Sequence, residues 1–186
     1  ARGAYKIPTV YITFGEDTTR WDASQWIGMY IYDDLGNRIW TKEEWIEDCT
    51  FQLDGAGIWP DIAKVEKCEV RGRGNSSWSQ SYMSKNPFRI KLPKKNKQSP
   101  FNLTEDRQWV FIANKQNGSM TSNSIAQKIA AMVDGEALCH MIPVDVYING
   151  HYRGSYCFTE KIGISDNSVA IDETTGCLIE LDDYFD

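Results

Sequence analysis

Histidine is scarce in this 186-residue sequence, and no two of its five cysteines form a Cys-x-x-Cys pair. We therefore expect no zinc site, because structural zinc takes about four Cys or His ligands at short spacings. Nucleophilic catalysis of the Ser-His or Cys-His kind has only His140 and His151 to draw on. His151 falls in a predicted hairpin turn and His140 lies just before a predicted strand, so hydrolase chemistry is not favoured.

Long apolar runs and an excess of positive charge are also missing. No run approaches the roughly 18 to 20 residues that span a bilayer, so we expect no membrane span. The formal net charge is −6 and the pI about 5.0, which argues against nucleic acid or an anionic membrane as a partner. Any cationic site must therefore be local. The cysteines are odd in number and widely spaced, which favours scattered buried thiols over a disulfide framework.

The composition that remains is that of a globular protein, with 41% hydrophobic and 25% charged residues. Its length fits one domain over residues 1–186. Seven Trp and nine Tyr residues leave two interpretations open: they fill a core, or they contact a ligand from the surface. A row of exposed aromatic side chains would favour the second.

Strand patterns dominate the chain. Outside the most basic segment we expect strands or hairpins at residues 7–14, 26–40, 109–114 and 144–162. The last of these contains Asn149-Gly150, the strongest short signal for a hairpin turn. A further short strand is expected at 176–183.

Two segments carry helix signals. Thr41 and Glu44 have the spacing of a capping box, which permits a short helix over 41–49. The segment 122–135 shows apolar residues at helical spacing, with an N-cap at Ser122 or Asn123. The predicted fold class is α+β: a mostly antiparallel sheet with one main helix.

The segment 71–92 concentrates positive charge in an acidic protein. If its two ends are strands, alternation puts Arg71 and Arg73 on one face and Arg89 and Lys91 on one face of the next strand. Four such cations on a common surface call for an anionic ligand or for acids on adjoining strands. The acids considered are Glu160, Glu180 and Asp182.

The loop between these strands suits an anion. Gly72 and Gly74 let the backbone approach a ligand, and Asn75 and Ser76 add short donors. Arginine suits phosphate because its planar fork donates two parallel hydrogen bonds. The segment matches neither a Walker A loop nor the kinase glycine-rich loop, and a solvated basic hairpin stays an open alternative.

Five segments, taken together and in order, resemble the spore-coat protein H (CotH) kinase family. They read RGRGNSSW, KNPFRIKL, WVFIAN, VYINGHYRGSYCFTEKI and LIELDD. The family shows R-G-N-S-[ST]-W, then K-[KN]-P-[YF]-R-[IL]-K, then N-G-x-Y-x-G-x-Y-x-x-x-E-K. The resemblance covers residues 5–186 and rests on linked motifs, which are more specific than any one of them.

The resemblance implies a divergent kinase-like fold that binds ATP and Mg²⁺ and phosphorylates Ser residues of a protein substrate. Residues 1–68 would be extra strands and 69–186 a kinase-like core resembling an N-lobe, with the helix near 123–134 in the place of αC. It also implies an extracellular, cell-surface or spore-associated bacterial protein. The implied cofactor-binding residues are Arg71, Arg73, Asn75, Ser76, Arg89, Lys91 and Glu160.

Some features of the family are not matched. Asn117 and Ser122 stand where the family commonly has an acid and an arginine, and the body of the predicted αC holds no Glu. The catalytic Asp segments of the family follow the hinge, so no catalytic residue is assigned. Glu160 is expected to orient a cation or a metal, or to pair with Arg89. The alternative function is a non-catalytic, pseudokinase-like module that binds carbohydrate or protein.

Overall fold

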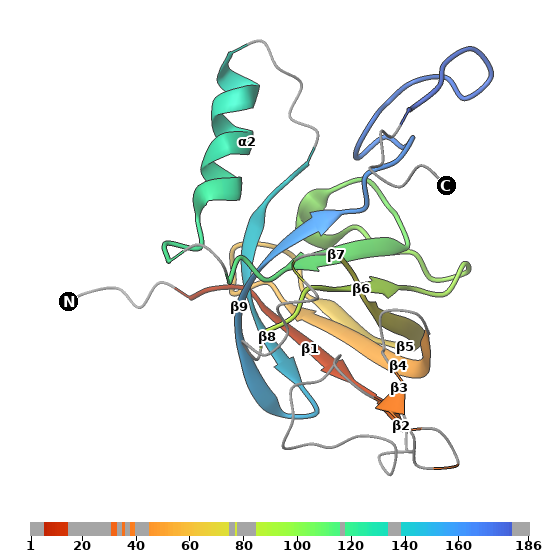
Figure 1. Cartoon of the computed structure of the whole chain (residues 1–186), viewed down its shortest axis with the longest axis vertical. Coiled ribbons are helices and arrows are strands. Elements are labelled where there is room, and N and C mark those ends of the chain that lie inside the picture. Colours follow the sequence, from red (N-terminus) through yellow and green to blue (C-terminus); the bar gives the residue numbers. More distant parts are fainter. Residues whose placement is uncertain are drawn as a thin grey trace.

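In the computed structural model, the described residues form a closed β-barrel with one α-helix outside its wall (Figure 1). The segments 75–76 and 78–84, which include the predicted donors Asn75 and Ser76, fall outside the described residues, as do Glu180 and Asp182. The structure describes residues 6–14, 31–32, 35, 38–39, 45–74, 77, 85–115, 118–133 and 139–179.

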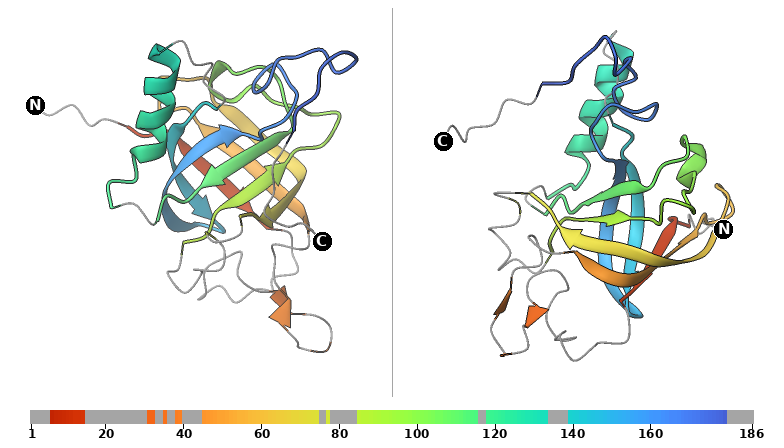
Figure 2. Two further views of the ribbon diagram at one scale, coloured as in Figure 1. Left: turned by 45° about the horizontal axis from the view of Figure 1, so that its top comes forward. Right: turned by 90° about the vertical axis from the view of Figure 1, so that its right-hand side faces the viewer.

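Seven strands form the barrel in the order β1-β4-β5-β6-β7-β9-β8. All neighbouring pairs are antiparallel except β1 and β8, whose parallel pairing closes the wall. Figure 2 shows this wall from two further sides. The barrel strands are β1 (Thr9–Thr13), β4 (Ile46–Asp54), β5 (Ile62–Gly72), β6 (Phe88–Lys91), β7 (Gln108–Ile112), β8 (Ile142–Ile148) and β9 (His151–Glu160).

Three smaller elements lie outside the barrel sheet. Strands β2 (Ile31–Tyr32) and β3 (Arg38–Ile39) pair with each other as a separate hairpin. A short 3₁₀ helix, η3, covers Pro100–Asn102, and the α-helix α2 covers Ser122–Met132.

The core fills the inside of the barrel with alternate residues of each strand. Trp109, Phe111 and Phe158 are buried there, and the rings of Trp109 and Phe158 stack with centroids 5.2 Å apart. Because successive side chains of a strand point to opposite faces, the residues between these positions face outward. Polar and charged functional groups are therefore carried on the outer face of the wall.

The predicted α+β fold, a mostly antiparallel sheet with one main helix resembling a kinase N-lobe, is wrong, because the strands close into a seven-stranded barrel. Closure depends on the pairing of Val10 with Val146, two residues far apart in the chain, and no local pattern predicts that contact. A closed barrel leaves no unpaired edge among its seven strands. Helix α2 was expected to bury an apolar stripe, but Ile125 and Ile129 remain exposed on it.

Of the other local predictions, some are confirmed and some are wrong. The strand at residues 7–14 and the hairpin at Asn149-Gly150 are confirmed, the turn having φ of 49° and 79° at these two residues. The helix at 122–135 is confirmed as α2, although its N-cap is Thr121. The short helix permitted over 41–49 is wrong for residues 46–49, which belong to β4, and residues 41–44 lie outside the described part of the chain. Residues 176–179 form no strand.

Within the described part of the chain, no helix has the length and apolar character to cross a membrane.

Candidate functional site

Strands β5 and β6 hold the predicted basic surface. They pair antiparallel with Arg71 opposite Arg89 and Glu69 opposite Lys91. Val70 and Ile90, the residues between them, are buried in the core, so the basic side chains face outward. The predicted hairpin and its shared basic face are confirmed for Arg71, Arg89 and Lys91.

An indole ring that the sequence argument missed lies over this face. The Trp45 ring centroid is 5.0 Å from Arg71 Cζ, 4.8 Å from Arg89 Cζ and 4.9 Å from Lys91 Nζ. Cations within about 6 Å of an aromatic face are attracted by its quadrupole. Lys91 also forms a salt bridge with Glu69. Trp45 and Glu69 thus offset part of the repulsion among these three like charges.

Next to this cluster a hollow of about 570 Å³, here called the arginine pocket, brings together three predicted site residues. Arg73 comes from the end of β5, Arg89 from β6 and Glu160 from the end of β9. Gln127 of α2 lines the same pocket. The pocket therefore lies between the outer barrel wall and the helix.

The two arginines of the pocket are half-buried and form no ion pair among the described residues. Burial lowers the pKa of Arg73, and burial followed by repulsion from Arg71 and Arg73 lowers the pKa of Arg89. Within the described residues neither arginine forms a salt bridge, and Arg89 Nε is buried without a hydrogen bond. A bound anion would stabilise a half-buried guanidinium in this position.

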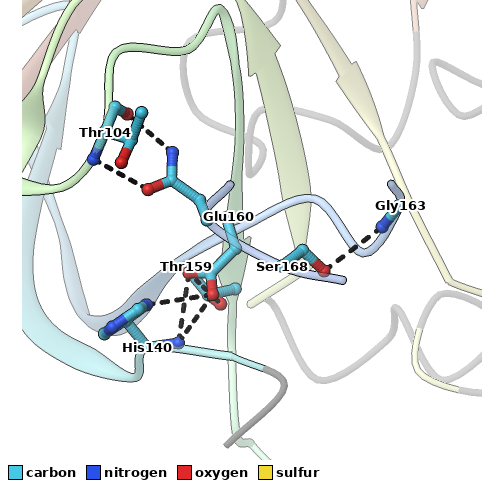
Figure 3. Close-up of polar contacts among 7 residues, drawn as sticks. Thr104, His140, Thr159, Glu160, Gly163 and Ser168 are labelled. Carbon is cyan, nitrogen blue, oxygen red and sulfur yellow. Dashed lines mark hydrogen bonds and ion pairs between the residues drawn. The ribbon is translucent and has the colours of Figure 1, made fainter. Parts of the chain in front are cut away.

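Glu160 is fixed by His140 and forms no ion pair with Arg89 among the described contacts. The backbone N–H of His140 donates to both carboxylate oxygens, at 2.9 and 3.1 Å, and His140 Nδ1 lies 3.1 Å from Oε1 (Figure 3). The carboxylate is fully buried, whereas His140 is about half exposed. Glu160 therefore ties the start of β8 to the end of β9 at the pocket wall.

A second hollow of about 360 Å³ shares Arg73 with the arginine pocket. It is lined by Asn114 and Lys115, which follow β7, and by Asn123 in the first turn of α2. Lys115 Nζ donates to the Asn86 side chain at 3.1 Å, and Asn123 Nδ2 donates to Asn114 Oδ1 at 2.7 Å. The sequence argument missed these residues, although the segment between β7 and α2 was already marked by its departure from the family pattern.

Lys85, a further cation of the predicted loop region, contacts another part of the barrel. Its Nζ donates to the Ser155 carbonyl and lies 4.8 Å from the ring centroid of Tyr156. Burial lowers the pKa of Lys85. These contacts hold Lys85 against β9, and it does not line the arginine pocket.

Comparison with known families decides the identity. Residues 70–186, more than half of the chain, match the family described as CotH kinase protein. The chain belongs to this family. The matched region begins within β5 and contains both hollows with the residues that line them. No curated protein matches the chain.

Proposed function

We propose that this CotH kinase family member is an ATP-dependent protein kinase whose arginine pocket binds the nucleotide phosphates. The observation that carries the proposal is the pair Arg73 and Arg89, two half-buried guanidinium groups in one pocket with no carboxylate partner among the described residues. Phosphate oxygens supply the negative charge and the acceptors that these groups lack.

The surrounding residues would prepare this pair for binding. Trp45 holds Arg89 from the outside, so the guanidinium is positioned before the ligand arrives. Glu160, tied to His140, adds a fixed negative charge to the pocket wall and limits how many phosphate charges fit near it. Asn75 and Ser76 remain predicted loop donors, and Lys91 and Arg71 would add their field from the adjoining surface.

The described residues of the pocket suit phosphate groups better than they suit a magnesium ion. Within the described residues, no three His, Cys, Asp or Glu side chains lie close enough together to hold a metal ion. Glu160 is the one acidic side chain that the described residues give to the pocket, and both its oxygens already accept hydrogen bonds. Mg²⁺ is commonly held by one or two carboxylates together with substrate phosphates. The residues described here thus fit the phosphates and do not form a cage for the ion.

Titration calorimetry with Mg-ATP tests the proposal. Wild-type protein should release binding heat, and Arg89→Ala should weaken binding by roughly tenfold to a hundredfold, because hydrogen bonds to charged groups contribute about 1.5 to 3 kcal/mol. Arg89→Lys should recover part of the affinity through charge alone. Lys64→Ala is the matched control, since Lys64 is an exposed β5 cation paired only with Glu66 among the described residues.

No binding heat from the wild type, or equal affinity of wild type and Arg89→Ala, would refute the assignment of the pocket. Transfer of labelled phosphate from ATP to a serine-containing protein then measures the kinase activity itself.

A further inference from the structure

Three tyrosines form a row across the outer face of the barrel, on the wall formed by β1, β8 and β9. Tyr11 pairs with Tyr147 between β1 and β8, and Tyr147 pairs with Tyr152 between β8 and β9. The ring centroids of Tyr11 and Tyr147 are 5.5 Å apart, and those of Tyr147 and Tyr152 are 5.3 Å apart. The planes turn by 28° and 49° along the row, as the sheet twists.

The row is open to solvent. Tyr11 is 38% exposed and Tyr152 is 55% exposed, whereas Tyr156, on the same strand as Tyr152, is buried in the core. Cross-strand aromatic pairs stabilise a sheet, but a continuous exposed row is more than a pair requires. Aromatic residues exposed in a row are typical of surfaces that contact a ligand.

Hydrogen-bonding groups flank the rings. Gln52 on β4 stands opposite Tyr11, and Asp145 accepts a hydrogen bond from Tyr152 Oη at 3.0 Å. A hollow of about 590 Å³ beside Tyr11 is lined by Gln52, Asp54 and Asp61. Within the described residues, none of the carboxylates of Asp54, Asp61 and Asp145 forms a salt bridge. We call this wall the tyrosine face: Tyr11, Gln52, Asp54, Asp61, Asp145, Tyr147 and Tyr152.

Charge and topology restrict what this face binds. Asp54, Asp61 and Asp145 form no salt bridge among the described residues, although Asp145 interacts electrostatically with Lys85. These carboxylates repel polyanions, which excludes nucleic acid and acidic glycans. β1 is paired on one side with β4 and on the other with β8, so an extended peptide cannot join the sheet as an added strand. An uncharged ligand with flat apolar faces and many hydroxyl groups suits the exposed rings and the hydrogen-bonding groups that flank them.

We propose that the tyrosine face binds an uncharged polysaccharide with an extended backbone. The C–H faces of successive sugar rings would stack on Tyr11, Tyr147 and Tyr152. Their hydroxyl groups would donate to Asp54 and Asp145 and exchange hydrogen bonds with Gln52. In the barrel order, β6 and β7 are the strands farthest from β1, so this site is separate from the arginine pocket and does not depend on ATP binding.

The test uses hexasaccharides of β-1,4-linked glucose, xylose and N-acetylglucosamine, titrated into the full chain by calorimetry. At least one should bind, and Tyr152→Ala and Tyr11→Ala should each weaken that binding about threefold to tenfold. Met132→Ala is the matched control, since Met132 is a large exposed apolar side chain on α2. It should bind the sugar as the wild type does.

Gln52→Ala keeps the three rings and removes a flanking amide, so it tests the face even if a tyrosine variant fails to fold. It should lower sugar affinity while circular dichroism and the unfolding temperature stay unchanged. The proposal is overturned if none of the three hexasaccharides binds, or if the tyrosine and glutamine variants bind as the wild type does. Tyr152-dependent binding of a decalysine peptide without sugar binding would assign the face to a cationic protein segment and would also overturn it.

Discussion

The two outer surfaces of this barrel, the arginine pocket and the tyrosine face, share one core and carry opposite chemistry. Arg73 and Arg89 at the pocket form no salt bridge among the described residues, and neither do Asp54 and Asp145 on the tyrosine face. In both places alternate residues of the same strands are buried. Strand alternation therefore lets one closed core present two independent surfaces, and separate changes should affect each of them.

The largest effect is expected in the barrel core, which supports both surfaces. Trp109 is fully buried and stacks on Phe158 in the core. Trp109→Ala should lower the free energy of unfolding by about 3 to 5 kcal/mol, because it leaves a large cavity. Urea unfolding followed by circular dichroism measures this loss, and ATP binding and sugar binding should fall together.

Tyr152→Ala is the control for this experiment, since the side chain is mostly exposed and its loss should leave the unfolding free energy within about 1 kcal/mol of the wild type. A Trp109→Ala protein of wild-type stability would show that the barrel core does not support the two surfaces.

A smaller loss of stability is expected at high pH. It arises on β4 and β5, the strands that connect the two surfaces. Cys49 and Cys68 face each other across these strands, and both are buried free thiols. Burial raises the pKa of Cys68 from its ordinary 9.0 to about 12 and also raises the pKa of Cys49. The unfolded chain thus loses these protons first, so the free energy of unfolding should fall as the pH rises from 9 toward 12.

Urea unfolding at intervals between pH 8 and pH 10.5 measures this slope. Tyr156, whose pKa is also raised by burial, contributes with the same sign, so the difference between proteins is decisive. The double variant Cys49→Ala/Cys68→Ala should lose stability less steeply with pH than the wild type. Equal slopes in the two proteins would contradict the buried-thiol explanation.

A moderate effect confined to one surface is expected from Trp45→Leu. Its ring lies within 5.0 Å of three cationic groups, and such contacts contribute about 0.5 to 2 kcal/mol. Without the ring, Arg71, Arg89 and Lys91 repel one another with less compensation and Arg89 is less well placed. Mg-ATP affinity should fall about threefold to tenfold in calorimetry, while sugar affinity is unchanged.

Trp45→Phe should restore most of the nucleotide affinity, because the phenyl ring keeps an aromatic face toward the cations. If Trp45→Leu and the wild type bind Mg-ATP equally while Arg89→Ala binds weakly, then Arg89 binds the nucleotide but Trp45 does not position it.

Sequence patterns predicted the parts of the molecule that depend on neighbours in the chain. Alternation around Arg71 and Arg89 predicted the β5–β6 hairpin and its basic outer face, and helical spacing predicted α2. The Asn149-Gly150 turn predicted the β8–β9 hairpin because few other residues adopt positive φ at both positions. These features need only local geometry.

The remaining features depend on contacts between distant segments. Closure of the barrel rests on the parallel pairing of β1 with β8, and the tyrosine row is visible only once that register is known. The sequence around Trp45 permitted a short helix but did not indicate which residues it would contact, so its place over the arginines could not be foreseen. Glu160 was expected to orient a cation or a metal, or to pair with Arg89, but the carboxylate accepts hydrogen bonds from the backbone N–H of His140.

The smallest effect should come from Tyr152→Phe, which removes only the hydroxyl that donates to Asp145 at 3.0 Å. The bond is exposed, so its loss should change the free energy of unfolding by less than about 1 kcal/mol. The ring stays in the row beside Tyr147, so sugar affinity should change less than twofold, in contrast to Tyr152→Ala. An equally large loss in both variants would mean that the hydroxyl–carboxylate pair, and not ring stacking, holds the ligand, and the contrast between an aromatic face and a cationic pocket would then become one between two charged sites.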